Sequence, residues 1–189
     1  SDKLAEDLAA KINLKKVINE VSSIKEEVHK DTIYITVVDK DRMAVSLIYS
    51  IFHGFGSGIA SEKFGVLFQN RGAGFNLIPG HVNEYGAGKR PLHTIIPAMV
   101  REKGTVKMPF GVMGGQYQAA GHARVLSNIY DFEMDIQTAL DAPRSFFENA
   151  SLRIERGYDE NTIQKLSSIG HNIDTKIAPI GGAQAIKIN

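Results

Sequence analysis

The chain has 189 residues, of which 43% are hydrophobic, which is enough for one domain with a sizeable buried core. Its 22 basic and 21 acidic residues leave a net charge of +1, which argues against a nucleic-acid-binding or polybasic membrane-binding surface. Cysteine is absent, so disulfides, thiolate chemistry and zinc–thiolate sites are excluded. No apolar run approaches the roughly 20 residues of a membrane helix. The compartment stays open, although the lack of cysteine favours the cytoplasm.

The beginning of the chain is predicted to form helices followed by a β-hairpin. Residues 3–12 and 14–28 carry apolar residues at helical spacing, which predicts two amphipathic helices. The segment 33–50 is rich in β-branched and aromatic residues on both sides of a turn near Asp41. This pattern predicts two antiparallel strands joined by a tight turn.

The next segment is predicted to be mostly loop. Residues 54–58 are rich in glycine, and a short strand is predicted at 64–68. From Asn70 to His93 the chain is rich in Gly, Pro and Asn, with little periodicity. A loop of this length in a compact domain is usually functional or mobile.

The remainder alternates between strands and helices. The predicted elements are a hairpin at 95–101 and 105–111, helices at 116–131 and 134–141, strands at 146–149 and 152–156, a helix at 160–169, and strands at 172–177 and 183–188. Strands in hairpin-linked groups with segregated helices predict an α+β fold, in which two layers of sheet are flanked by helices.

Thr32 stands at the start of the first predicted strand. Antiparallel partners lie symmetrically about a turn, so residues whose numbers sum to about 82 should face each other. This register places Thr32 opposite Ser50, with two hydroxyl groups at the open end of the hairpin. A slip of one residue would move Ser50 to the other face.

These hydroxyl groups suggest nucleophilic chemistry. A threonine hydroxyl is a weak nucleophile unless a base activates it, and one such base is its own α-amino group, which titrates near about 7.7–8.0 when free. That route requires a chain break immediately before Thr32. Farther along, Gly114 and Gly115 offer bare backbone N–H groups of the kind that hold an oxyanion. On spacing alone, an ordinary strand threonine and an ordinary glycine turn remain the alternative.

Other catalytic and cofactor motifs are absent from the sequence. None of the histidines shows metal-ligand spacing, and the glycine-rich segment 54–58 lacks the lysine and the spacing of a phosphate loop. No nucleophile-elbow motif of the serine hydrolase type occurs. The sequence therefore predicts neither a metal nor a cofactor.

Several segments match the small subunit of γ-glutamyltranspeptidases, in the same order. They are Thr32–Asp41, Ala44–Ser46, Phe55–Gly58, Gly88–Leu92 and Gly114–Gly115. The chain thus resembles this family over roughly residues 32–189, as a catalytic small-subunit domain, and residues 1–31 resemble the helical tail of its large subunit. The resemblance implies an αββα sandwich of the N-terminal-nucleophile hydrolase type. It also implies a precursor that cuts itself and then transfers or hydrolyses γ-glutamyl groups.

The resemblance assigns catalytic roles by position. Thr32 matches the nucleophile, and the bond between Asp31 and Thr32 matches the bond that the precursor cleaves. Ser50 matches a second threonine that hydrogen-bonds the nucleophile, and it keeps the hydroxyl group. Gly114 and Gly115 match the oxyanion hole.

The substrate-binding positions depart from the family pattern. His93 and Thr94 match two serines that bind the substrate α-carboxylate, and only Thr94 keeps a hydroxyl. Phe52 replaces an asparagine, Arg71 replaces a glutamine, and Gly74 replaces the aspartate that grips the substrate α-ammonium. An arginine suits a carboxylate and repels an ammonium. We therefore interpret Arg71 as a substrate clamp and expect an acylase related to γ-glutamyltranspeptidases more than a true glutathione enzyme.

The implied partners are the large-subunit part of the same precursor and a small-molecule amide or γ-glutamyl substrate. An oligomer is compatible with the sequence. Binding to nucleic acid or to a membrane is not expected. Two alternatives remain open. One is a cephalosporin-acylase-like or glutaryl-amide hydrolase. The other is a catalytically silent relative, which need not cut its own chain.

Overall fold

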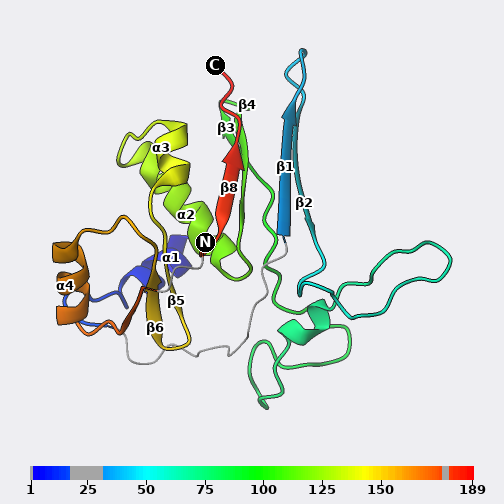
Figure 1. Cartoon of the computed structure of the whole chain (residues 1–189), viewed down its shortest axis with the longest axis horizontal. Coiled ribbons are helices and arrows are strands. Elements are labelled where there is room, and N and C mark those ends of the chain that lie inside the picture. Colours follow the sequence, from blue (N-terminus) through cyan, green and yellow to red (C-terminus); the bar gives the residue numbers. More distant parts are fainter. Residues whose placement is uncertain (1, 18–31, 176–178) are drawn as a thin grey trace. The chain divides into compact units, whose positions relative to one another are not determined.

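The structure, a computed structural model, describes residues 2–17, 32–175 and 179–189 (Figure 1). Packing divides the chain into two compact units instead of the single domain expected from its length. One unit comprises Ser1–Glu26 with Pro143–Ile180, and the other comprises Glu27–Ala142 with Gly181–Asn189. The predicted boundary between residues 1–31 and 32–189 is a site of chain cleavage, which the division into packed units does not test. It stays a prediction, because Asp31 lies outside the described residues.

The second unit begins with the predicted hairpin, formed by β1 (Thr32–Val38) and β2 (Ala44–Ser50). Its turn is closed by Asp39, whose Oδ1 accepts hydrogen bonds from the backbone N–H of Asp41 at 2.9 Å and of Met43 at 2.8 Å. Such a side-chain bond to the backbone two residues ahead favours a turn over a continued strand. The turn therefore sets the register of the hairpin.

A second sheet in the same unit has the strand order β3–β4–β8. It consists of β3 (Ala98–Glu102), β4 (Thr105–Met113) and β8 (Gly182–Ala185), and both neighbouring pairs are antiparallel. Lys103 and Gly104 form the β3–β4 turn with φ angles of 46° and 83°. The predicted second hairpin is confirmed, although β8 is shorter than the strand expected at 183–188.

The two sheets contact each other through Tyr34 of β1 and Gly111 of β4. Tyr34 is 1% exposed, and its hydroxyl and that of Ser46 are hydrogen-bonded at 2.8 Å. A Cβ atom on Gly111 would overlap the Tyr34 ring. Only glycine therefore permits this approach of the β1–β2 sheet to β4.

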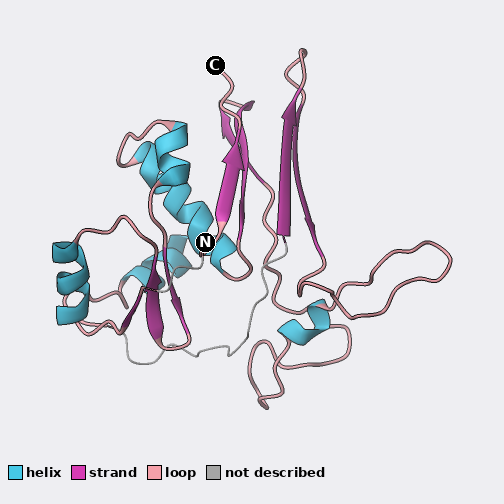
Figure 2. Cartoon of the chain, viewed as in Figure 1, coloured by secondary structure: helices cyan, strands magenta, loops and turns pink. Residues whose placement is uncertain are grey.

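Two helices cover the other face of the β3–β4–β8 sheet (Figure 2). They are α2 (Tyr117–Tyr130) and α3 (Ile136–Asp141), as predicted within a few residues. Gly121 of α2 lies against Val112 of β4, so closely that a Cβ atom would overlap that side chain. The helices and the sheets confirm the predicted α+β class.

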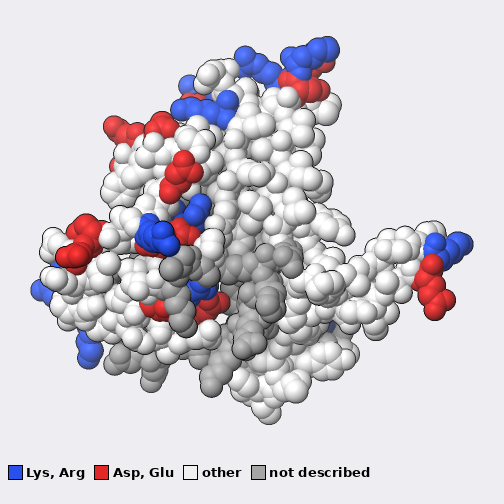
Figure 3. Space-filling model, in the orientation of Figure 1, with Lys and Arg blue, Asp and Glu red and all other residues white. Residues whose placement is uncertain are grey.

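The outer face of β1–β2 is apolar and has no cover among the described residues. Six of its side chains are between 44% and 62% exposed: Ile33, Ile35, Val37, Val45, Leu47 and Tyr49. In Figure 3 charged side chains gather at the tip of this hairpin and at the tip of the 54–68 loop, with uncharged surface between them. An apolar face of this extent on a sheet marks a contact surface.

The first compact unit contains a small sheet with helices. Its elements are α1 (Asp2–Ala9), β5 (Ser145–Glu148), β6 (Ser151–Ile154), α4 (Glu160–Ser168) and β7 (Ile173–Asp174). The sheet order is β5–β6–β7, with an antiparallel first pair and a parallel second pair. Glu155 ties this unit together, because its carboxylate accepts from the backbone N–H of Arg144 and of Ile180 and pairs with the Arg144 guanidinium at 3.0 Å.

Two predicted elements differ from the structure. Residues 64–68 form no strand, and the loop around them carries only the isolated bridge between Ala60 and Leu67. Of the helix predicted at 14–28, residues 14–17 are not helical, with a turn at 14–15, and the rest lies outside the described residues. None of the described helices is long and apolar enough to cross a membrane.

Candidate active site

The site is built on the open end of the β1–β2 hairpin. Thr32 is the first residue of β1 and pairs with Ser50, the last residue of β2, which confirms the predicted register. The Thr32 hydroxyl donates to Ser50 Oγ at 3.3 Å, and the backbone N–H of Phe52 donates to the same oxygen at 3.3 Å. Both residues of the pair are half-buried. Ser50 thus links Thr32 to the backbone that follows β2.

Phe52 occupies a strained backbone position beside this pair. Its φ angle is 79°, in the left-handed region that bulky side chains rarely adopt and that costs about 1–3 kcal/mol. Its buried ring stacks on His53 at 4.8 Å between centroids, and it lies 5.5 Å from the guanidinium carbon of Arg71. The strained turn therefore presents an aromatic face to a cation.

Gly114 and Gly115 form the junction between β4 and α2. Their φ angles are 134° and 62°, and both residues are buried. Their carbonyl groups accept from the N–H groups of Tyr117 and Gln118 in the first turn of α2, whereas their own N–H groups have no hydrogen-bond partner within the described ranges. Two buried N–H donors at a helix N-terminus form a site suited to negative charge.

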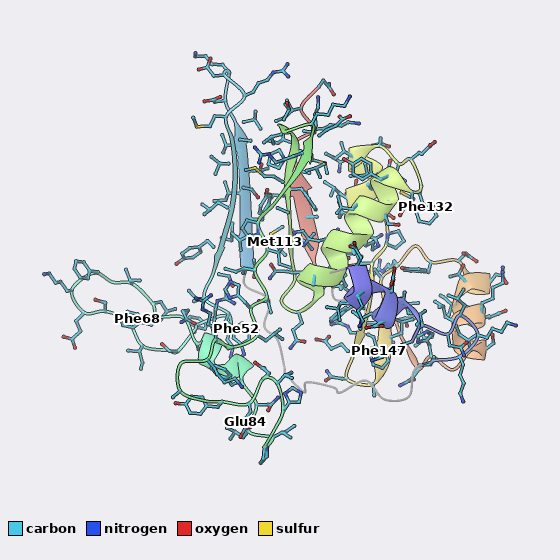
Figure 4. All side chains as sticks on the ribbon, turned by 180° about the vertical axis from the view of Figure 1, so that it is seen from behind. Phe52, Phe68, Glu84, Met113, Phe132 and Phe147 are labelled. Atoms are coloured by element: carbon cyan, nitrogen blue, oxygen red, sulfur yellow. The ribbon has the colours of Figure 1, made fainter. Side chains whose placement is uncertain are left out.

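The structure brings the hydroxyl pair and the glycine pair to the same end of the facing sheets. Tyr34, two residues inside β1, packs on Gly111, which lies two residues before the end of β4 at Met113. Figure 1 shows that β1 starts at the end where β4 runs into α2, and Figure 4, from the opposite side, shows the same with Met113 labelled.

Arg71 lies beneath the end of β2, in the short 3-10 helix η1 (Arg71–Gly74). It is 9% exposed, and its Nη2 donates to the Ser50 carbonyl at 3.3 Å while Nη1 donates to Thr94 Oγ1 at 3.4 Å. Burial lowers the pKa of Arg71 from its ordinary value, but an arginine stays charged. Within the described part of the chain no carboxylate pairs with it.

A pocket of about 460 Å³ opens at Arg71. Its lining residues are Gln69, Arg71, Gly72, Arg90, Pro91 and His93. The two residues of the predicted substrate-binding pair have different environments. His93 is exposed and lines the pocket, whereas Thr94 is buried and its hydroxyl accepts a hydrogen bond from Arg71. Arg90 also lines the pocket, and the sequence pattern does not predict this role, although Arg90 belongs to the Gly88–Leu92 segment that matches the family.

Gly74, the last residue of η1, is buried beside this pocket. A Cβ atom there would lie 3.4 Å from the Leu92 carbonyl, 3.7 Å from Pro91 and 3.8 Å from Phe52. These are ordinary van der Waals distances, so a larger side chain at this position meets no obstacle at its first atom. The position is therefore open to a test by substitution.

Comparison with known proteins identifies the family. The model of the gamma-glutamyltranspeptidase family matches residues 1–189. This chain belongs to the gamma-glutamyltranspeptidase family. Similar curated relatives include the glutathione hydrolase-like YwrD proenzyme of Bacillus subtilis strain 168, which is 37% identical over 171 residues, covering 86% of this chain and 33% of that protein. The oxamate amidohydrolase proenzyme of Klebsiella pneumoniae is 34% identical over 150 residues, covering 76% of this chain and 28% of that protein.

Solved members of the gamma-glutamyltranspeptidase family and of the acylases share the fold. The cephalosporin acylase from Bacillus halodurans has a TM-score of 0.85 and 34% identity, covering 100% of this chain and 34% of that chain. Gamma-glutamyltranspeptidase from Pseudomonas nitroreducens, complexed with L-DON, has a TM-score of 0.73 and 26% identity, covering 82% of this chain and 89% of that chain. The present chain spans about a third of the length of the curated relatives it matches.

Proposed function

We propose that this member of the gamma-glutamyltranspeptidase family is the nucleophile-bearing part of a self-processing threonine amidohydrolase and acyltransferase. The observation that carries the proposal is the hydrogen bond from Thr32 to Ser50 at the first residue of β1. Two further features support it: the buried N–H groups of Gly114 and Gly115 at the same end of the sheets, and the family to which the chain belongs.

The first step of the proposed mechanism is cleavage of the precursor. Thr32 Oγ1 attacks the carbonyl carbon of Asp31, and the peptide C–N bond breaks as the acyl group moves from nitrogen to oxygen and the hydroxyl proton passes to the nitrogen. Water then hydrolyses the ester, which releases the Asp31 carboxylate and leaves Thr32 with a free α-amino group. That amine has an ordinary pKa near about 7.7–8.0, so a sufficient fraction is neutral to act as a base.

The mature enzyme would use the same oxygen on its substrate. The α-amine takes the Thr32 hydroxyl proton as Oγ1 attacks the amide carbonyl, and the oxyanion accepts hydrogen bonds from the N–H groups of Gly114 and Gly115. The α-ammonium returns the proton to the leaving amine as the C–N bond breaks. Water or an acceptor amine then attacks the Thr32 ester, which makes the overall reaction a hydrolysis or an acyl transfer.

Ser50 is proposed as the residue that orients the nucleophile. Its Oγ accepts the Thr32 hydroxyl and the Phe52 N–H, so it is fixed by the backbone as well as by the threonine. A fixed acceptor removes rotational freedom from the Thr32 side chain before attack.

The partner is proposed to be the remainder of the precursor, packed on the outer face of β1–β2. The relatives are about three times as long as this chain, and the names of the two curated relatives describe proenzymes. The six exposed apolar side chains of that face are the surface that a covering layer would bury. A helical layer there would complete the αββα sandwich.

A trapping experiment tests this proposal. The full-length protein is mixed with a chromogenic anilide donor, quenched in acid during turnover, and digested for peptide mass mapping. We expect the mass of the acyl group on the peptide that begins at Thr32. Turnover with the acyl group on another residue would contradict the mechanism. An intact, inert protein would identify the chain as a silent relative.

A further inference from the structure

Arg71 is a buried cation that lines a pocket, is linked to the proposed nucleophile through Ser50, and lacks a counter-charge among the described residues. We propose that this pocket binds a carboxylate of the acyl donor, so that the substrate is the monoamide of a short dicarboxylic acid. The inference rests on the proposed function and adds the substrate class to it.

The hydrogen bonds of Arg71 leave room for an anion. Its two described contacts go to neutral oxygen atoms, the Ser50 carbonyl and the Thr94 hydroxyl, at 3.3 Å and 3.4 Å. Charge-assisted bonds between a guanidinium and a carboxylate are shorter, at about 2.7–2.9 Å, and are often bidentate. A guanidinium has five N–H donors, so a fork remains for a carboxylate. Phe52 lies close to the guanidinium, which limits its solvation.

The charges around the pocket point the same way. Arg90 and His93 line it together with Arg71, and no acidic residue of the described ranges does. Residues 51–97 contain two carboxylates, Glu62 and Glu84. Glu84 accepts from the Gly80 N–H at 2.8 Å, and Figure 4 shows it well away from Phe52. The local field therefore favours a carboxylate and disfavours an ammonium group.

The link through Ser50 limits the length of the donor. Ser50 binds Arg71 through its carbonyl and Thr32 through its hydroxyl. The Arg71 guanidinium and the attacking oxygen are thus connected through one residue and its two hydrogen bonds. A donor that fills both has few carbons between its carboxylate and its amide, as in the oxalyl to glutaryl series.

The test compares anilides that differ in one charge. We would measure kcat/KM of the full-length protein for oxalyl-, succinyl- and glutaryl-p-nitroanilide against the uncharged butyryl-p-nitroanilide. The kcat/KM of at least one carboxylated donor should exceed that of the butyryl donor by roughly tenfold or more. Arg71→Gln should lower kcat/KM for that donor by roughly ten- to hundredfold more than it lowers kcat/KM for the butyryl donor, which is the value of one charge-assisted hydrogen bond. Arg101→Gln, in β3, is the matched control.

Equal losses for both donors in Arg71→Gln would show that Arg71 acts only on the position of Ser50, and would overturn the proposal. Because Arg71 is buried, its substitution can disturb the fold, so Arg90→Gln provides a second, milder variant. It should lower kcat/KM for the carboxylated donor alone by about two- to fivefold. Calorimetric binding of glutarate, which has no amide bond to cleave, to the wild-type protein separates this proposal from the mechanism. Binding that Arg71→Gln abolishes supports the anion site even if no donor turns over, and no binding contradicts it.

Discussion

Arg71 donates to the Ser50 carbonyl at 3.3 Å, and the Ser50 hydroxyl accepts from Thr32 at 3.3 Å. One residue at the end of β2 therefore contacts both the buried cation and the threonine. The two contacts use different atoms of Ser50, its carbonyl and its side chain. A substitution of the side chain removes one contact and keeps the other, so the two roles can be separated by experiment.

Ser50→Ala removes the hydroxyl that orients Thr32 and keeps the carbonyl that holds Arg71. We expect kcat to fall roughly ten- to hundredfold, which corresponds to one oriented hydrogen bond of about 1–3 kcal/mol, with little change in KM for a carboxylated donor. Ser50→Thr keeps the oxygen and should retain most of the activity. Steady-state kinetics of the two variants give the comparison, and equal kcat in the alanine variant and the wild type would make Ser50 a strand residue only.

Gly74→Asp adds a carboxylate in η1, three residues after Arg71. The added Cβ fits at van der Waals distances, so the effect should come from charge. We expect the new carboxylate to compete for Arg71, which lowers kcat/KM for a glutaryl donor, and to raise the ratio of γ-glutamyl to glutaryl turnover by about tenfold. Gly74→Ala is the steric control. The interpretation fails if the alanine variant shifts the ratio as much as the aspartate variant.

Gly111→Ala should destabilise the second unit by about 1–3 kcal/mol, because its Cβ overlaps the buried Tyr34 ring and forces the sheets apart. Chemical denaturation measures this change. Gly72→Ala is the control, since an added Cβ at Gly72 meets no atom within 4 Å and its effect should stay within about 0.5 kcal/mol. Equal effects of both substitutions would show that the Tyr34 contact does not fix the sheets.

Glu155 gives the first unit a dependence on pH. Burial acts to raise the pKa of this carboxyl, but the N–H groups of Ile180 and Arg144 and the Arg144 charge outweigh it, so the pKa is lowered from the ordinary 4.5. A lowered pKa in the folded state adds stability that is present above the unfolded value and is lost as the pH falls through the folded one.

Glu155→Gln should therefore lower the free energy of unfolding by about 1–3 kcal/mol at neutral pH, and the difference from wild type should shrink as the pH falls below 4.5. Denaturation curves at several pH values measure it. The exposed Glu102→Gln is the control and should show neither effect. A difference that stays constant with pH would mean that packing, not the charge, is responsible.

The sequence contained enough to predict the hairpin and the pairing of Thr32 with Ser50, because a tight turn at Asp39–Asp41 fixes the partners on both strands. It also predicted the glycine pair before α2. These features are local, so they follow from turn chemistry and from periodicity.

The contact of Arg71 with Ser50 could not be predicted in the same way. The loop that connects the two residues has no regular structure, so no periodicity in its sequence indicates that its ends meet. The strand expected at 64–68 was wrong for a related reason. Phe64, Val66 and Phe68 are 51% to 72% exposed, so their apolar character has no core to face among the described residues. Exposed apolar residues that alternate along a loop give the same sequence pattern as the residues of a half-buried strand.

The most direct measurement is the mass of the full-length protein and the sequence of its new N-terminus. The account predicts two fragments, one of which begins at Thr32, and it predicts that Thr32→Ala stays in one piece under the same conditions. Thr32→Ser, which keeps a hydroxyl group, should still be cleaved. A wild-type protein that turns over its substrate with the bond between Asp31 and Thr32 intact would contradict the central claim.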